Sequence, residues 1–299
     1  MRFDLKTVLL EGPDASGKTT AYSQIHKLTG FKWNIHDRST LSMLCYAIMY
    51  NRDVDHWRQL VREEFHDLNN AIVVFLPPIE AIQERILSRG DEFQDTSTIV
   101  NLYKIFIQEV TPFVNYPNVM VIRKEIPDYN IIAKWLLSLE SQTYEKLAQM
   151  CHKIVDQTPT KEINFLKLSW TDTDFSTILK SSLYYRDEVE YYEATRIKIL
   201  DKLRDEVLGK NEYGMPQSLK SRRFVMTQDS CISFMHFVHR EGVLHVNIAC
   251  RSSEVSRIFH HDIHFLAEMG RFTRKTLEIP DQTPVRFYVT LDSAHVILQ

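Results

Sequence analysis

The chain has 299 residues, of which 44% are hydrophobic and 25% are charged, and these values exclude a disordered protein. Its net charge of -3 provides no overall attraction to nucleic acid, and no stretch approaches the ~18 apolar residues of a membrane span. The four cysteines form no CxxC pair, which argues against a zinc or redox motif. We therefore expect a protein of the reducing cytoplasm, or of the host cytoplasm if it is viral.

The first 140 residues alternate between apolar runs that predict strands and longer segments that predict helices. The expected strands are 7–10, 31–36, 71–76 and 119–122. The expected helices are 18–27, 40–50, 54–68, 79–89, 98–114 and 129–139. This alternation predicts an α/β fold with a parallel sheet that helices cover on both faces.

The pattern changes after about residue 142. The expected helices are a connecting one at 143–155 and a charged one at 184–207, and the expected strands are 224–226, 232–238, 243–249 and 285–290. Glu241 and Gly242 separate two of these strands and indicate a hairpin. We therefore expect two domains, an α/β domain at 1–145 and an α+β domain at 155–299.

A phosphate-binding loop is the most specific motif of the sequence. Residues 12–19 match G-x-x-x-x-G-K-[ST] between a predicted strand and a predicted helix, although a chance match in a glycine turn is the alternative. Backbone N–H groups and the helix N-terminus would bind phosphate, Lys18 would reach the β- and γ-phosphates, and Thr19 would hold Mg²⁺. The sequence thus predicts a phosphotransferase that uses ATP and Mg²⁺. The expected ATP-binding residues are Gly12, Pro13, Asp14, Ala15, Ser16, Gly17, Lys18, Thr19 and Thr20.

Three motifs of the first half together resemble the thymidylate kinase family. Residues 11–20 fit that family's E-G-x-D-x-x-G-K-[ST]-T, and residues 37–42 fit its D-R-x-x-x-S. Arg85 and Arg89 fit the arginine pair of its lid region. The resemblance covers about residues 5–140 and implies the family's kinase fold and activity.

The resemblance also implies roles for single residues. Asp14 would contact the acceptor nucleoside, Arg38 would bind acceptor-side phosphate, and Asp37 would lie near Mg²⁺ or the acceptor oxygen. Arg85 and Arg89 share one helix face and would neutralise charge on the transferring group. The alternatives are a solvated basic face for these two arginines and a helix cap for Asp37. The expected catalytic residues are Lys18, Asp37, Arg38, Arg85 and Arg89, and the metal residues are Thr19 and Asp37.

The sequence departs from this family in one respect. Only 16 residues separate Thr20 from Asp37, whereas thymidylate kinases place a strand and helices between the two motifs. Much of the usual mononucleotide pocket is therefore missing or rebuilt. This argues against free dTMP as the acceptor.

Part of the second half resembles thymidylate synthase and the related dCMP hydroxymethylase. Residues 221–223 match the family's S-R-R, and residues 251–254 fall on its R-S-x-D phosphate-binding motif. Asp262 falls on its pyrimidine-reading position. The resemblance implies a substrate-binding role for this region, and a homodimer. The residues concerned are Arg222, Arg223, Arg251, Ser252 and Asp262.

Cys231 falls where this family has its nucleophilic cysteine, but its surroundings differ. The usual Pro-Cys-His is Ser230-Cys231-Ile232 here, and the folate-binding and proton-relay elements are not recognisable. Because Cys231 begins an apolar run, we expect a buried cysteine without chemistry.

A kinase half joined to a deoxyuridine-binding half resembles the 5-hydroxymethyluracil DNA kinases of phages that hypermodify thymine. The resemblance implies transfer of the ATP γ-phosphate to the 5-hydroxymethyl group of the base within DNA, after the base is flipped out. Three alternatives remain: a free deoxynucleotide kinase, a bifunctional kinase and hydroxymethylase, and an ATP-switched binding protein. The expected partner is thus DNA containing 5-hydroxymethyluracil, or a deoxynucleotide.

Overall fold

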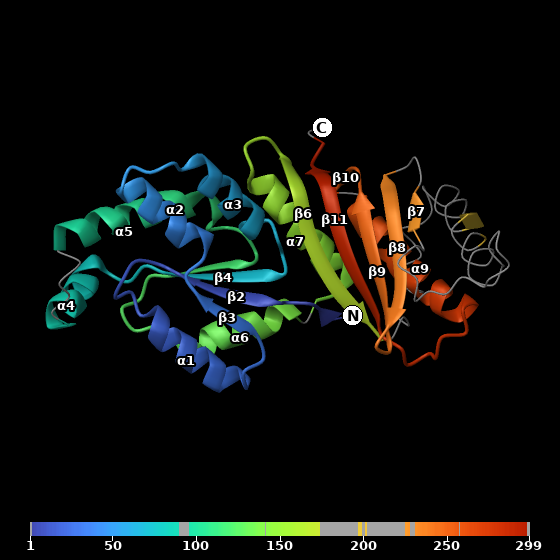
Figure 1. Ribbon diagram of the computed structural model, residues 1–299, viewed down its shortest axis with the longest axis horizontal. Helices are drawn as coiled ribbons and strands as arrows, with labels where there is room; N and C mark the ends of the chain where they lie inside the picture. Colours follow the sequence, from blue (N-terminus) through green and yellow to red (C-terminus); the bar gives the residue numbers. More distant parts are fainter. Residues whose placement is uncertain are drawn as a thin grey trace. The chain divides into compact units, whose positions relative to one another are not determined.

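The computed structural model describes residues 2–89, 96–140, 142–173, 197–198, 201, 225–227, 231–256 and 258–297. The fold is mixed α/β (Figure 1), and the chain divides into two compact units. The N-terminal unit is Leu5–Glu140, and the C-terminal unit combines Met1–Asp4 with Ser141–Gln299. No helix among the described residues is long and apolar enough to cross a bilayer.

A parallel sheet forms the centre of the N-terminal unit, as the alternating pattern predicted. Its described strands follow the order β3 (Asn34–Asp37), β2 (Thr7–Glu11), β4 (Asn70–Phe75) and β5 (Val119–Ile122), and every neighbouring pair is parallel. The apolar residues of β2 and β4 are buried, because helices pack on both faces of the sheet.

Helices α1 and α6 lie on one face of this sheet, and α2, α3 and α5 lie on the other (Figure 1). Their bounds, with those of α4 and a short 3₁₀ helix η1, are α1 Lys18–Thr29, α2 Thr40–Met49, α3 Asp55–Phe65, α4 Ile79–Arg89, α5 Thr96–Val110, η1 Thr111–Phe113 and α6 Tyr129–Glu140.

Two boundaries differ from the sequence prediction for local reasons. The helix expected to reach residue 114 ends at Val110, because Pro112 cannot continue the α-helical hydrogen bonds and η1 follows instead. The strand expected from residue 31 begins at Asn34. Gly30 and Phe31 have φ angles of 63° and 57°, and this left-handed backbone ends α1 before the strand begins.

The C-terminal unit contains a mixed sheet with β11 near its centre. Strand β11 pairs antiparallel with β6 and parallel with β9. The described strands follow the order β1-β6-β11-β9-β8-β7, and β10 pairs with β11. Their bounds are β1 Arg2–Phe3, β6 Glu162–Asp172, β7 Val225–Thr227, β8 Ile232–Arg240, β9 Val243–Cys250, β10 Ser253–Glu254 and β11 Val285–His295.

Two helices of the C-terminal unit, α7 (Tyr144–Gln157) and α9 (Phe259–Thr276), pack against each other and contact this sheet. The predicted hairpin is confirmed. Glu241 and Gly242 connect β8 to β9 with φ angles of 51° and 73°, the left-handed pair that a two-residue hairpin turn requires. This unit is therefore α+β, and its similarity to thymidylate synthase stays a prediction.

Several features of the C-terminal unit were not predicted from the sequence. Strand β6 and helix α9 were missed. The first residues of the chain were expected in the first domain, but Phe3 pairs with Trp170 of β6 and is fully buried. Most of the helix expected at 184–207 lies outside the described residues.

Candidate active site

The loop from Gly12 to Gly17 connects the end of β2 to the start of α1, and two of its glycines are required by geometry. Gly12 has φ 136°, and a Cβ atom there would lie 2.4 Å from the Phe75 carbonyl oxygen. Gly17 has φ 101° and caps α1. Only glycine adopts these angles without strain, so the motif forms a tight loop at a helix N-terminus, a favourable position for phosphate.

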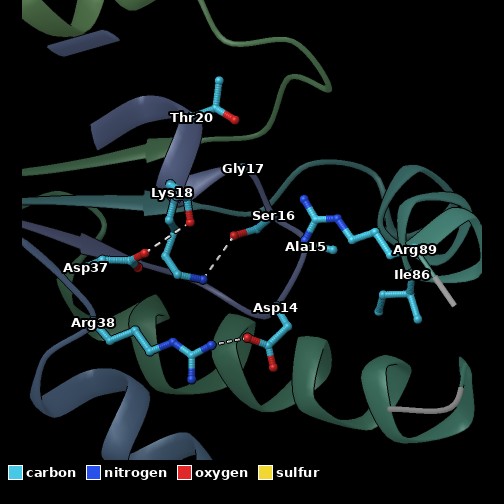
Figure 2. A pocket seen from close by; sticks show the side chains of 11 residues that line it. Asp14, Ala15, Ser16, Gly17, Lys18, Thr20, Asp37, Arg38, Ile86 and Arg89 are labelled. Atoms are coloured by element: carbon cyan, nitrogen blue, oxygen red, sulfur yellow. Dashed lines mark hydrogen bonds and ion pairs between the residues drawn. The ribbon is translucent and has the colours of Figure 1, made fainter. Parts of the chain in front are cut away.

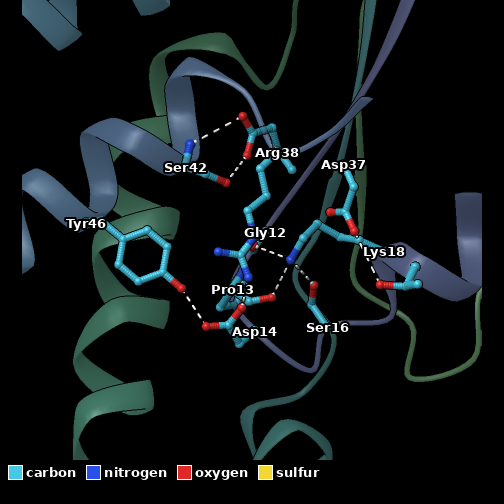
Figure 3. A network of polar contacts seen from close by, with 11 residues as sticks. Gly12, Pro13, Asp14, Ser16, Lys18, Asp37, Arg38, Ser42 and Tyr46 are labelled. Atoms are coloured by element: carbon cyan, nitrogen blue, oxygen red, sulfur yellow. Dashed lines mark hydrogen bonds and ion pairs between the residues drawn. The ribbon is translucent and has the colours of Figure 1, made fainter. Parts of the chain in front are cut away.

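Lys18 lines the pocket, but its ammonium group points back into the loop. Its Nζ donates hydrogen bonds of 2.7 Å to the carbonyl oxygens of Gly12 and Pro13, and it lies 3.4 Å from Ser16 Oγ (Figure 3). Its side chain is only 5% exposed, and this burial lowers its pKa to about 8. The sequence predicted an extended Lys18 at the phosphates, which would require this ammonium group to exchange two carbonyl partners for phosphate oxygens.

Thr19 and Asp37, the predicted metal residues, lie together. Thr19 Oγ1 donates a 3.2 Å hydrogen bond to Asp37 Oδ2, because parallel pairing of β2 and β3 brings the end of β3 beside the start of α1. Among the described residues, no three His, Cys, Asp or Glu side chains form a metal-binding group. Two protein oxygens still fit Mg²⁺, which is commonly held by few protein ligands together with substrate phosphates and water.

Arg38 and Asp14 form an ion pair on the opposite side of Lys18 (Figure 3). Tyr46 of α2 donates a 2.5 Å hydrogen bond to the second carboxylate oxygen of Asp14. Sequence analysis did not identify Tyr46. Its position four residues after Ser42, the last residue of the D-R motif, would place it on the same helix face and is the signal that could have found it.

The backbone of Arg38 has an unusual conformation, and the buried carboxylate of Glu11 holds the residues that follow it. The φ angle of Arg38 is 77°, in the left-handed region that a non-glycine residue rarely occupies. The next residue, Ser39, donates its backbone N–H to Glu11 at 2.8 Å, and Ser42 donates its own at 3.3 Å. Both serine hydroxyls also donate to Glu11, which is completely buried at the N-terminus of α2. Glu11 therefore holds the segment that presents Asp37 and Arg38.

The predicted arginine pair lies on α4, beside the loop. Arg85 Nη1 donates to the Ala15 carbonyl oxygen at 3.1 Å, and Nη2 donates to the Glu125 carbonyl oxygen at 2.9 Å. Arg89 is exposed and lines the same pocket, together with Ile86 (Figure 2).

One pocket collects most of the predicted residues of the N-terminal unit, but Gly12, Pro13 and Arg85 do not line it. The loop, the end of β3 and α4 each contribute to its walls. The lining residues are Asp14, Ala15, Ser16, Gly17, Lys18, Thr19, Thr20, Asp37, Arg38, Ile86 and Arg89. The pocket thus brings Arg38 and Arg89 to the same space as the Thr19–Asp37 oxygen pair, which suits a cation.

The structure describes three of the five predicted residues of the C-terminal unit. Arg251 is exposed and Ser252 is half-buried, whereas Asp262 is 4% exposed and accepts a 3.0 Å hydrogen bond from Ser253 Oγ. Arg222 and Arg223 lie outside the described residues. A substrate role for all five residues stays a prediction, and so does a homodimer.

The expectation of a buried Cys231 was wrong. The side chain is exposed, because Cys231 precedes the first residue of β8 and its backbone carbonyl oxygen accepts a 2.8 Å hydrogen bond from the Arg251 N–H.

The comparisons with known proteins do not show a family. No protein-family model matches the chain, and no curated protein matches it. Among solved structures, the chain is similar to the YorR protein of Bacillus subtilis in complex with phosphorylated GDP. The match has 16% sequence identity and a TM-score of 0.38, and it covers 45% of this chain and 95% of that chain. At this TM-score the similarity carries no argument about the present protein.

Proposed function

We propose that the N-terminal unit is an ATP-dependent phosphotransferase. The observation that carries this proposal is the joint position of three features around one pocket. They are the glycine loop before α1, the Thr19–Asp37 oxygen pair, and arginines on both sides of Lys18. A protein that only binds a nucleotide needs the loop. It does not need an acceptor side such as the one that Asp14, Arg38 and Tyr46 form.

The chemistry follows from these positions. An acceptor hydroxyl oxygen forms a bond to the γ-phosphorus of ATP, the bond from that phosphorus to the β–γ bridging oxygen breaks, and ADP leaves. The hydroxyl proton passes to Asp37 or to solvent. Thr19 and Asp37 would hold Mg²⁺, which would supply charge neutralisation at the phosphates.

The roles of the cationic side chains are electrostatic. Lys18 binds the β- and γ-phosphates after it leaves the carbonyl oxygens of Gly12 and Pro13. Arg85 and Arg89 stabilise charge on the transferring phosphoryl group, and Arg38 orients the acceptor. Catalysis in this proposal consists of positioning and charge stabilisation, without a covalent enzyme intermediate.

A matched pair of lysine variants tests the phosphotransferase. Lys18→Ala should lower transfer of labelled γ-phosphate by about 100- to 1,000-fold, the effect of removing one well-placed transition-state contact. Lys27→Ala, which removes an exposed lysine on the same helix, should leave the rate unchanged. Transfer by Lys18→Ala at the wild-type rate would refute the assignment of the loop.

For the acceptor, we propose the 5-hydroxymethyl group of 5-hydroxymethyluracil in DNA, as the family resemblance implies. One structural fact supports a large acceptor. Only residues 30–33 connect α1 to β3, so no additional strand or helix closes the acceptor side between the loop and Asp37. A pocket open on this side has room for a base that is still attached to its strand.

Three acceptors offered side by side separate the candidate functions. The comparison uses dTMP, free hydroxymethyl-dUMP and DNA containing hydroxymethyluracil, each with γ-labelled ATP. We expect label in the DNA. Label in dTMP alone would favour a free deoxynucleotide kinase, and ATP binding without transfer to any acceptor would favour an ATP-switched binding protein.

A further inference from the structure

Two tyrosines and two arginines form a continuous row that leads away from the candidate active site. The Arg38 guanidinium lies over the Tyr46 ring at 5.7 Å, and the Arg52 guanidinium lies over the Tyr50 ring at 5.4 Å. The two tyrosine rings are nearly parallel, with an interplanar angle of 12° and centroids 6.3 Å apart. We name these four residues the stacking row.

The far end of the stacking row is held in place by the backbone. At the end of α2, the N–H of Arg52 bonds to the Ala47 carbonyl oxygen at 2.8 Å, and the N–H of Asn51 bonds to that of Ile48 at 3.1 Å. Asn51 has φ 49°, so these bonds complete a Schellman motif. The motif turns the chain back and places Arg52 over Tyr50. The row is therefore presented on an ordered turn.

The stacking row begins in the pocket and ends outside it. Arg38 lines the pocket, whereas Tyr50 and Arg52 do not. Tyr50 is 56% exposed, and Met43, seven residues or two helical turns earlier, is 51% exposed. Arg52 is exposed and forms no ion pair within the described part of the chain. The nearby carboxylate of Asp53 instead accepts a 3.1 Å hydrogen bond through Oδ1 from the N–H of Asp55, the first residue of α3.

We propose that the stacking row binds a nucleic-acid strand with unpaired bases, next to the nucleotide that receives the phosphate. This inference rests on the proposed phosphotransferase function and specifies its acceptor. Aromatic rings stack on the faces of bases of any sequence, and arginine guanidinium groups stack on bases and contact backbone phosphates. Two adjacent aromatic rings with a guanidinium group at each end provide the chemistry of a single-strand binding surface.

The length of the stacking row argues for a polymer over a free nucleotide. One base has two faces and covers at most two of the four groups. A mononucleotide acceptor seated in the pocket at Arg38 would therefore leave Tyr50 and Arg52 without a function in binding. A strand that continues from the pocket places its next bases over these residues. The alternative is a purely structural role, in which Tyr50 and Arg52 only stabilise the end of α2.

Strand binding is measured with the full chain and a short, fluorescently labelled single-stranded deoxyoligonucleotide at low salt, without ATP. Tyr50→Ala should weaken binding about 10-fold, the effect expected from loss of one stacked base. Tyr50→Phe should bind nearly as wild type, because it keeps the ring. Tyr22→Ala, which removes a 40% exposed tyrosine on α1, should have no effect.

Arg52→Ala is an independent test. The slope of log affinity against log salt concentration should decrease in magnitude by about one unit, because binding with one phosphate contact fewer displaces fewer counterions. Equal oligonucleotide binding by wild type and Tyr50→Ala would overturn the proposal, as would a wild-type protein that does not bind the oligonucleotide at all.

A kinetic comparison keeps this proposal separate from the proposed function. Tyr50→Ala should raise KM for an oligonucleotide acceptor about 10-fold, with kcat and KM for a mononucleotide acceptor unchanged. An equal loss with both acceptors would show that Tyr50 acts on the fold of α2, and would overturn the strand proposal. Failure of Lys18→Ala to reduce transfer would refute the phosphotransferase, while the binding assay without ATP would still test the row.

Discussion

The two units of this chain both bury charged side chains, but these side chains serve different purposes. In the N-terminal unit, buried Lys18 lines the pocket and bonds to the loop, and buried Glu11 bonds to the segment that follows Arg38. In the C-terminal unit, buried Asp172 accepts hydrogen bonds from Tyr144 at 2.8 Å and from Trp170 at 3.1 Å.

Arg274 continues this contrast. Its Nη1 donates a 3.0 Å hydrogen bond to the Thr283 carbonyl oxygen, which fixes the segment after α9. Asp172 and Arg274 of the C-terminal unit thus join helices, strands and loops to one another, whereas Glu11 and Lys18 of the N-terminal unit support a surface that a ligand can reach. The comparison teaches that burial of charge locates a site only when the partners border a pocket.

Glu11→Ala should produce the largest effect and sharpens this comparison. The substitution leaves four hydrogen-bond donors of Ser39 and Ser42 without their buried acceptor. We expect a loss of about 3 kcal/mol in the free energy of unfolding, measured with urea. The rate of phosphate transfer should fall by more than the loss of folded protein accounts for, because the segment that carries Asp37 and Arg38 is no longer held by Glu11.

Two variants control this experiment. Glu84→Ala removes an exposed carboxylate on α4 and should leave stability and transfer unchanged. Glu11→Gln keeps an oxygen for the two backbone N–H groups and should retain much of both. Unchanged transfer in Glu11→Ala would contradict the positioning role.

Gly270→Ala should cost less and acts only on the C-terminal unit. A Cβ atom at this position of α9 would lie 2.5 Å from Phe287 Cζ and 3.0 Å from Val285 Cγ1. Such overpacking costs about 1–3 kcal/mol, which thermal unfolding would detect. The folded variant should still transfer phosphate at the wild-type rate.

A second substitution checks the cause of that loss. Phe287→Leu replaces the ring that meets the new methyl group with a shorter side chain. The double variant should therefore recover part of the stability that Gly270→Ala loses. Two results together would contradict the separation of roles between the units. They are a double variant that recovers no stability, and reduced phosphate transfer by folded Gly270→Ala.

The sequence predicted continuous features of the N-terminal unit and missed contacts between distant residues. The loop, α1 and the four strands follow from local patterns. The partners of Asp14 do not, because Arg38 and Tyr46 lie 24 and 32 positions away. The inward position of Lys18 depends on the loop carbonyl groups, which a motif does not describe.

In the C-terminal unit, long-range pairing decided more of the fold. Strand β1 has two residues and gains its structure from β6, more than 160 positions later. Within β6, Phe165 has φ 60° and interrupts the regular alternation that identifies a strand. Helix α9 contains Gly270 and three histidines, which weaken the helical pattern in the sequence.

The pH dependence of ATP binding should be a smaller effect than that of Glu11→Ala or of Gly270→Ala. Burial, followed by the charge of Arg38, lowers the pKa of Lys18 to about 8 in the free protein. Bound phosphate favours the ammonium form, so the pKa must be higher in the complex. Above about pH 8 binding therefore requires proton uptake, and affinity should fall by up to tenfold per pH unit until the pKa of the complex is reached.

Calorimetric titration with ATP in buffers of different ionisation enthalpy would measure this proton uptake. Lys18→Ala should bind more weakly and lose the dependence over the same pH range. A wild-type affinity that does not change above pH 8 would show that Lys18 does not contact the phosphates.

Cys231→Ser should have the smallest effect and is the direct test of a C-terminal unit without its own chemistry. The cysteine side chain is exposed, and its backbone carbonyl, not its sulfur, accepts the hydrogen bond from Arg251. Stability should therefore change by less than about 0.5 kcal/mol, and phosphate transfer should stay at the wild-type rate.

Cys250→Ser is the matched control, because it places a hydroxyl at a site that is only 1% exposed. Burial at this site also raises the pKa of the Cys250 thiol well above its usual value. It should destabilise the protein by about 1–2 kcal/mol. Loss of transfer in Cys231→Ser at unchanged thermal stability would give the C-terminal unit a chemical role, and the contrast between the two units would then be wrong.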